Sequence, residues 1–159
     1  MSTSDCPFCQ RLAQLELQPD VDVVWQFPHS VALLGPWQYY QGYCIVVARQ
    51  HASELNQLPS DLRYAYFAEM CCVAQALEGA FGPLKLNYEL LGNQAPHLHW
   101  HLFPRYADDP GRLQPVWLAL HRAKSDVNEK RRLQQGRLDR SAILQKLRDT
   151  ISNLTSLRS

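Results

Sequence analysis

Three histidines recur at every second position of one short apolar segment, at His97, His99 and His101. Because side chains in a β-strand alternate between its two faces, this spacing predicts that the three imidazoles project from one face. Leu98 and Trp100, which lie between them, then project from the other face, and their apolar character marks it as the core face. Imidazole has the ordinary pKa closest to neutrality, so such a row suits nucleophilic attack, proton transfer or metal binding.

A plainer interpretation exists, since a single histidine is usually an ordinary surface or core residue. Three of the chain's six histidines, however, fall within five consecutive positions and on one predicted face. We therefore interpret the row as a functional site. His29, in a predicted turn, and His121 are expected to have no particular role.

The elements that must position this row form a predicted antiparallel sheet of about five strands. The expected strands cover residues 21–27, 31–35, 42–48 and 85–91, followed by the histidine segment itself. The first two predict a hairpin, and the nearly continuous apolar run of residues 42–48 predicts a central strand. The strand over residues 85–91 leads through a Gly-Asn turn into the histidine segment, so we expect these two to be antiparallel neighbours.

One strong helix is predicted over residues 60–81, because apolar residues recur there every three or four positions. Ser60 is expected to cap its start and Gly82 to end it. A second amphipathic helix is predicted from Asp139 onward, and Trp117 with its apolar neighbours could pack back onto the body. A sheet with one main helix packed on it and a C-terminal helical extension makes the expected fold class α+β.

The net charge of +1 conceals an acidic first part and a basic second part. Residues 1–111 carry five basic and eleven acidic side chains, and residues 112–159 carry eleven and four, so their net charges are −6 and +7. Such an extension can bind nucleic acid, dock on the acidic body or lie near a polyphosphate ligand. The sequence shows no basic groove with interleaved aromatic residues of the kind that binds single-stranded nucleic acid, which argues against such a partner. The polar segment 124–136 is expected to be a linker or a solvated helix.

The cysteines indicate a reduced protein with one candidate metal-binding pair. Five is an odd number, and the N-terminus lacks the basic and apolar regions of a signal peptide, so we expect a cytoplasmic protein without disulfides. The pair Cys6 and Cys9 is compatible with a metal knuckle, a redox dithiol or chance. A structural zinc site needs four ligands, so two would have to come from elsewhere in the chain.

The histidine segment and its flanks resemble a known family. The segment resembles the signature of the histidine triad (HIT) superfamily, in which three histidines alternate with apolar residues, at His97-Leu98-His99-Trp100-His101-Leu102-Phe103. The flanks Gly92-Asn93-Gln94-Ala95-Pro96 and Pro104-Arg105-Tyr106 look most like a bacterial branch described as diadenosine tetraphosphate hydrolase-like. The resemblance covers roughly the first two-thirds of the chain. It implies a HIT-like fold, with a HIT domain over residues 4–110 and a basic helical extension over residues 111–159.

The resemblance also implies a covalent mechanism in which the middle histidine, His99, is the nucleophile and becomes transiently nucleotidylated. A histidine nucleophile divides nucleotidyl transfer into two displacements at phosphorus. His101 would bind the α-phosphate oxygens and assist the leaving group, and His97 would be a zinc ligand or an orienting group. Asn93 and Gln94 would supply hydrogen-bond donors to the phosphates.

The resemblance implies two further groups of residues. The resemblance implies a structural zinc site of two cysteines and two histidines, which many members with an N-terminal Cys-x-x-Cys pair carry. In this chain the ligands would be Cys6, Cys9, His51 and His97. Trp37, beside Tyr39 and Tyr40, could stack on a nucleobase or pack in an edge loop. Family members usually carry an Asp or Asn for the ribose near the position of Gly35, and this chain has none there.

The predicted activity is hydrolysis of a nucleoside phosphate or dinucleoside polyphosphate at the α-phosphorus through a nucleotidyl-histidine. One alternative is a nucleotidyltransferase or phosphorylase of the same superfamily, although that relative usually has Gln where this chain has His101. Another is a non-catalytic nucleotide-binding or scaffold protein. Mg²⁺ bound to the substrate's phosphates is compatible with the mechanism. The resemblance further implies a homodimer, and neither a membrane nor nucleic acid is expected as a partner.

Overall fold

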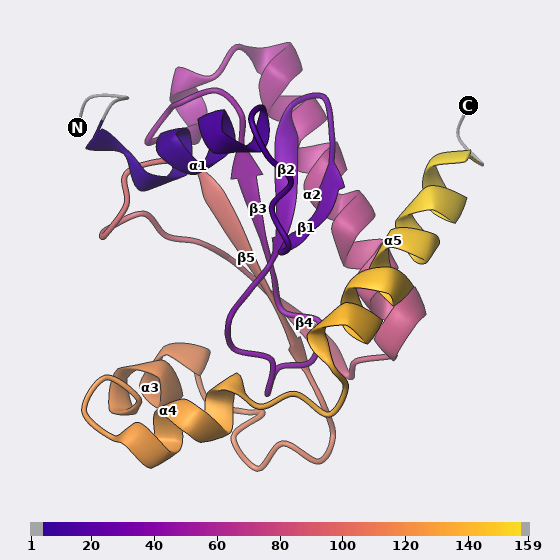
Figure 1. Ribbon diagram of the computed structural model, residues 1–159. Coiled ribbons are helices and arrows are strands. Elements are labelled where there is room, and N and C mark those ends of the chain that lie inside the picture. The colour runs from indigo at the N-terminus through magenta and orange to yellow at the C-terminus, as the bar shows by residue number, and fades with distance from the viewer. Residues whose placement is uncertain (1–4, 157–159) are drawn as a thin grey trace.

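The fold is a five-stranded antiparallel sheet between two layers of helices (Figure 1). The computed structural model describes residues 5–156. In spatial order its strands are β1 (Val23–Gln26), β2 (Ser30–Leu34), β3 (Cys44–Ala48), β5 (His99–Arg105) and β4 (Lys85–Leu90). Its helices are α1 (Pro7–Leu15), the 3-10 helix η2 (Leu55–Gln57), α2 (Ser60–Phe81), α3 (Val116–Arg122), α4 (Val127–Gln134) and α5 (Arg140–Ser156). The predicted α+β class, the hairpin and the central β3 are confirmed.

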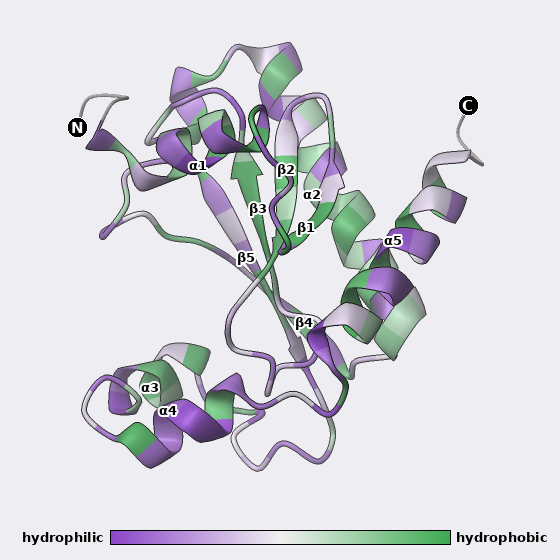
Figure 2. Cartoon of the chain, viewed as in Figure 1, coloured by the Kyte–Doolittle hydropathy of each residue, from purple (hydrophilic) through white to green (hydrophobic). Residues whose placement is uncertain are grey.

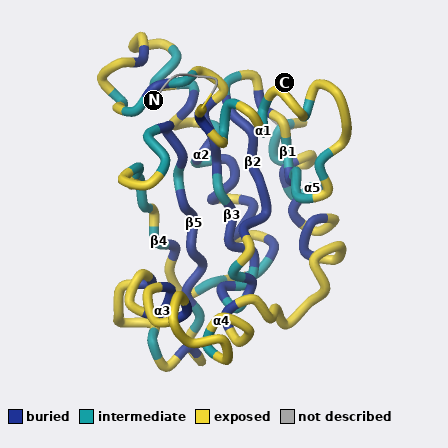
Figure 3. The backbone as a smooth tube through the Cα atoms, turned by 60° about the vertical axis from the view of Figure 1, so that its left-hand side comes forward, coloured by how far each residue is buried: buried dark blue, intermediate teal, exposed yellow. Residues whose placement is uncertain are grey.

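Both faces of the sheet are covered, which is why its middle strands are apolar throughout. In β2, Ala32 and Leu34 belong to the core beneath α2 and α5, whereas Val31 and Leu33 pack against α1. All five residues of β2 are therefore buried. Figure 3 shows the same burial along β3 and β5, the strands nearest the middle of the molecule.

Helix α2 begins and ends at the predicted residues, but its start is not capped as expected. Pro59 occupies the position before the helix, and no side chain among the described residues caps it. Ser60 is already the first helical residue, and its hydroxyl accepts a hydrogen bond from Arg63 instead. The proline's fixed φ makes the turn into the helix without a side-chain cap. At the other end Gly82 adopts the left-handed conformation, with φ +56°, and its N–H donates to the Glu78 carbonyl.

The C-terminal residues complete the main core and cover the acidic body. Ile143, Leu147 and Ile151 of α5 are fully buried with α2 and the sheet. Arg140 pairs with Asp22 at 2.5 Å, so part of the basic segment docks on the acidic one. Segment 124–136 contains the hydrophilic helix α4, anchored through one buried side chain, Leu133 (Figure 2).

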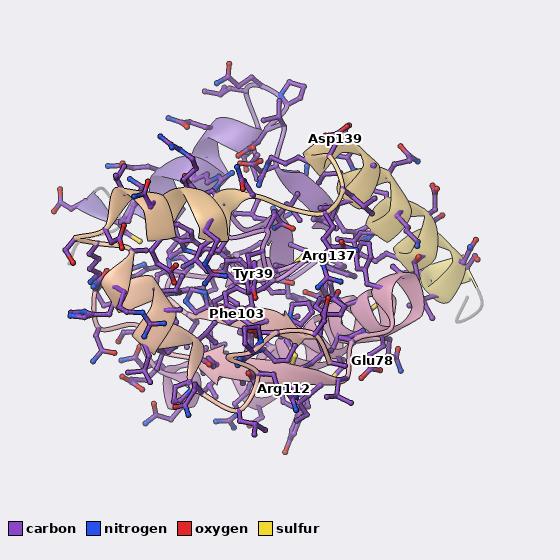
Figure 4. The ribbon with its side chains drawn as sticks, turned by 90° about the horizontal axis from the view of Figure 1, so that it is seen from below. Tyr39, Glu78, Phe103, Arg112, Arg137 and Asp139 are labelled. Atoms are coloured by element: carbon purple, nitrogen blue, oxygen red, sulfur yellow. The ribbon has the colours of Figure 1, made fainter. Side chains whose placement is uncertain are left out.

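Helices α3 and α4 close the remaining part of the sheet's second face. Phe103 of β5 and Tyr40 are buried among their apolar residues, together with Tyr43. Viewed from that end of the molecule, Tyr39 and Phe103 lie near the centre, while Glu78 and Arg112 lie toward the rim (Figure 4). In residues 5–156, no helix combines the length and the apolar character needed to cross a membrane.

Candidate active site and metal centre

His99 and His101 lie on the sheet face opposite the α2 core. Leu98 and Leu102 point into that core, so the predicted alternation is confirmed for His99 and His101, whereas His97 lies before the strand and does not share their cavity. Both histidines are nearly buried, with 6% and 9% of their surface exposed, and both border a cavity of about 470 Å³. The residues predicted to bind substrate also line this cavity: Trp37, Asn93 and Gln94.

The ring of His99 is held in one orientation by a backbone contact. Its Nδ1 lies 2.6 Å from the carbonyl oxygen of His97. A carbonyl only accepts, so Nδ1 carries the proton and Nε2 carries the free lone pair. Burial lowers the pKa of His99, which keeps the ring neutral near pH 7. The ring of Phe8 packs on it with 4.6 Å between ring centres.

The ring of His101 is held in the opposite tautomer. Its Nδ1 lies 2.7 Å from the hydroxyl of Tyr43, which is buried and has a pKa raised by that burial. Burial, helped by the nearby His99, lowers the pKa of His101 to about 4. A protonated phenol facing a neutral imidazole donates to Nδ1, so the proton of His101 resides on Nε2. The pair therefore offers a lone pair at His99 and an N–H donor at His101.

His97 belongs to a different group of side chains. It precedes β5 rather than lying in it, and it does not line the cavity. Its Nε2 donates to the carbonyl of Ala48 at 2.7 Å, which leaves Nδ1 unprotonated. That Nδ1 lies 3.4 Å from Sγ of Cys6 and 3.5 Å from Sγ of Cys9. Of the two roles predicted for His97, its position matches the metal ligand, and its carbonyl orients His99.

The topology explains why four distant residues meet. Antiparallel pairing of β3 with β5 puts Val47 opposite His99, so His51 after β3 and His97 before β5 lie at the same end of the sheet. Cys6 immediately precedes α1, and Cys9 follows within its first turn.

The shortest distances within this cluster are close to those of a tetrahedral zinc site. The four ligand atoms of Cys6, Cys9, His51 and His97 lie within 4.8 Å of one another. His51 Nδ1 is 3.2 Å from His97 Nδ1 and 3.3 Å from Cys9 Sγ. Zinc bond lengths in tetrahedral geometry require N–N and N–S separations of about 3.3 Å and 3.6 Å. The bond from His97 to the Ala48 carbonyl is the kind of outer contact that orients a metal-binding imidazole.

Comparison with known families agrees with this geometry. The sequence model of the HIT domain matches residues 16–108, more than half of the chain. The chain belongs to the HIT domain family. HIT membership supports a nucleotide-binding or hydrolase type of function. The matched region contains the histidine segment and the Asn93–Gln94 turn, whereas Cys6, Cys9 and helices α3 to α5 lie outside it.

Individual HIT relatives show the same fold. The chain is 28% identical over 120 residues to Protein hit of Bacillus subtilis, covering 71% of this chain and 79% of the relative. A crystal structure of a Zn-bound histidine triad family protein from Mycobacterium smegmatis superposes with a TM-score of 0.69 at 16% identity, covering 98% and 99% of the two chains. A histidine triad protein from Marinobacter aquaeolei gives a TM-score of 0.64 at 23% identity, covering 91% and 95%.

The cavity lining also includes residues that were not predicted from the sequence. Phe8 comes from α1, and Trp117, His121 and Lys124 come from α3 and the turn after it. The sequence did carry a signal for the second set, because positions 117, 121 and 124 have the spacing of four and three that is typical of one helical face. His121, expected to have no particular role, is therefore among the residues that line the cavity.

Proposed function

We propose that this HIT protein hydrolyses a nucleoside phosphate or dinucleoside polyphosphate at the α-phosphorus. It would then resemble the diadenosine tetraphosphate hydrolase-like branch in activity. Nε2 of His99 attacks the phosphorus, a nitrogen–phosphorus bond forms, and the bond to the leaving group breaks. Water then attacks the nucleotidyl-histidine, releasing the nucleoside monophosphate and returning His99 to its free form.

One observation carries this proposal. His99 donates from Nδ1 to the carbonyl of His97 at 2.6 Å while it borders the cavity. A neutral imidazole with its lone pair fixed on Nε2 is the form needed for attack on phosphorus, and it requires no general base to activate it.

The surrounding residues support the same chemistry. The N–H of His101 at Nε2 would donate to an α-phosphate oxygen or to the leaving-group oxygen, where negative charge develops. Asn93 and Gln94 at the cavity mouth would donate to further phosphate oxygens, and Trp37 would stack on the nucleobase. Mg²⁺ would enter with the substrate's phosphates, since no carboxylate is among the lining residues that the structure describes.

We assign a structural role to zinc in this proposal. Four protein ligands, Cys6, Cys9, His51 and His97, leave no open position for substrate. Bound zinc would fix the segment from Cys6 to Cys9, which places the ring of Phe8 against His99. The attack on phosphorus would be carried out by His99, assisted by His101, and not by the zinc ion.

The test is to capture the intermediate. Brief exposure to diadenosine tetraphosphate, quenching in alkaline denaturant and mass spectrometry without an acid step should show a gain of one AMP moiety on the peptide that contains His99. His99→Ala should abolish both the adduct and turnover while nucleotide binding persists, and His29→Ala, at a half-buried histidine outside the cavity lining, should change neither. Binding without adduct or turnover in the wild type would instead support a scaffold protein. Formation of ADP when inorganic phosphate is supplied would indicate a phosphorylase.

We also propose that residues 4–110 act as the HIT domain, that residues 111–159 are its extension, and that the protein is a homodimer. Strand β4 is at the edge of the sheet, where its outer backbone groups can pair with a second copy. Tyr64 and Phe67 on α2 are 73% and 53% exposed, more apolar surface than one protomer uses. Light scattering should give the mass of a dimer, and Tyr64→Ser with Phe67→Ser should weaken it.

A further inference from the structure

One face of α3 forms part of the cavity wall. Trp117, Leu120, His121 and Lys124 all line the cavity. The spacing of Trp117, Leu120 and His121 places these three on one face of α3, and Lys124 follows in the turn after the helix. This face lies outside residues 16–108, the part of the chain that the HIT domain model matches.

Helix α3 is firmly attached beside the histidines. The indole N–H of Trp117 donates to the carboxylate of Glu89, which pairs directly with His101 across the β4–β5 ladder. The Trp117 ring packs edge-on against His101 at 5.3 Å. Leu120 is buried in the cluster that contains Tyr43. Packing therefore fixes Trp117 and Leu120 beside the histidines, and it places the exposed side chains of His121 and Lys124 along the same side of the cavity.

The charge of this wall suits an anion. Lys124 is the one Lys or Arg among the described residues of the lining, and that lining contains no Asp or Glu. Within residues 5–156, no ion pair joins Lys124 to a carboxylate. Asp126, the nearest acidic residue in the sequence, uses its side chain to cap α4 at the N–H groups of Asn128 and Glu129. The ammonium group of Lys124 is thus available to neutralise the negative charge of an anion bound in the cavity.

The distance along the helix separates Lys124 from the attacked phosphate. Trp117 touches His101, and Lys124 follows seven residues later, in the turn just after α3 ends at Arg122. The helical rise over this stretch would place it about 10 Å further along. A phosphate held by His101 would occupy the Trp117 end. Lys124 would then meet groups further along the substrate, on the leaving-group side or beyond.

We propose that Lys124, assisted by His121, forms a second phosphate subsite that binds the phosphates beyond the one attacked by His99. The site would then select nucleotides with a polyphosphate chain over those with a single phosphate. This inference deepens the proposed function and rests on it for the place of the attacked phosphate. Lys124 acts here as a specificity residue and takes no part in bond breaking.

The experiment compares binding of AMP and ATP by calorimetry without added Mg²⁺, so it does not depend on turnover. The wild-type protein should bind ATP more tightly than AMP. Lys124→Gln should reduce that ATP-to-AMP preference by roughly tenfold, the loss expected for one charge-assisted hydrogen bond. Lys124→Arg should retain most of the preference, because the charge remains. Lys130→Gln, at an exposed lysine of α4 outside the cavity lining, is the matched control and should leave it unchanged.

Each outcome decides the inference. A wild-type protein that binds both nucleotides equally, or a Lys124→Gln variant that keeps the full preference for ATP, overturns it. If Lys130→Gln lowers the preference as much as Lys124→Gln, the effect is general surface charge and the subsite is rejected. The proposed function fails separately: a protein that shows the Lys124-dependent preference but forms no His99 adduct has the subsite without the hydrolysis.

Discussion

Replacing Tyr43 by Phe tests whether the tautomer of His101 matters for catalysis. The change removes only the hydroxyl that lies 2.7 Å from Nδ1 of His101, and it leaves the buried ring in place beside Phe103. Without that donor, Nδ1 of His101 has no hydrogen-bond partner among the described residues, and the ring can carry its proton on either nitrogen.

The expected loss follows from the contribution of one buried hydrogen bond. A net value of about 1 kcal/mol corresponds to roughly a fivefold lower kcat/KM. The loss should appear mainly in kcat, because the bond positions a donor to charge that develops in the transition state. By contrast, His99→Ala removes the nucleophile and should lower the rate by several orders of magnitude.

The assay is hydrolysis of diadenosine tetraphosphate followed by chromatography of the products, at pH 7. Tyr40→Phe is the matched control, since Tyr40 is another buried tyrosine on Phe103 whose hydroxyl makes no described contact with either cavity histidine. It should retain nearly full activity. Wild-type kcat in Tyr43→Phe, or a loss as large as that of His99→Ala, would contradict the positioning role assigned to Tyr43.

Three other perturbations have defined outcomes. The pKa of His101 is lowered from 6.5 to about 4, so its neutral form stabilises the fold fully above pH 6.5 and this contribution is lost as the pH falls toward 4. Urea unfolding should therefore give a free energy of unfolding about 2 kcal/mol lower at pH 5 than at pH 7. His101→Gln should remove this part of the pH dependence. Cys9→Ser or a strong chelator should lower the free energy of unfolding of metal-loaded protein by about 4 kcal/mol when metal is a thousandfold above its Kd, whereas Cys71→Ser, outside the cluster, should retain the chelator response. Leu147→Ala should cost about 2–5 kcal/mol in denaturant unfolding because the side chain is fully buried, and an equal cost for the exposed Ser152→Ala would refute packing as the cause.

Periodicity along the chain determined a good part of this fold. Apolar spacing in residues 60–81 predicted α2, and the positive φ that Gly82 can adopt predicted its end. Alternation at His99 and His101 predicted their shared face, and the apolar run within residues 42–48 predicted a central strand. These features depend on neighbours within a few residues, so the sequence alone contains the information.

Only the tertiary structure decided which distant groups meet. His97 has the same spacing as the other two histidines, yet its position before β5 and the pairing of β5 with β3 bring it to Cys6, which lies 91 residues away in the sequence. The face of α3 was readable as a helical stripe, but nothing local indicates that Trp117 rests on His101 and that Lys124 borders the same cavity. Contacts of this kind are set by strand order and by how layers pack, and local periodicity carries no record of either.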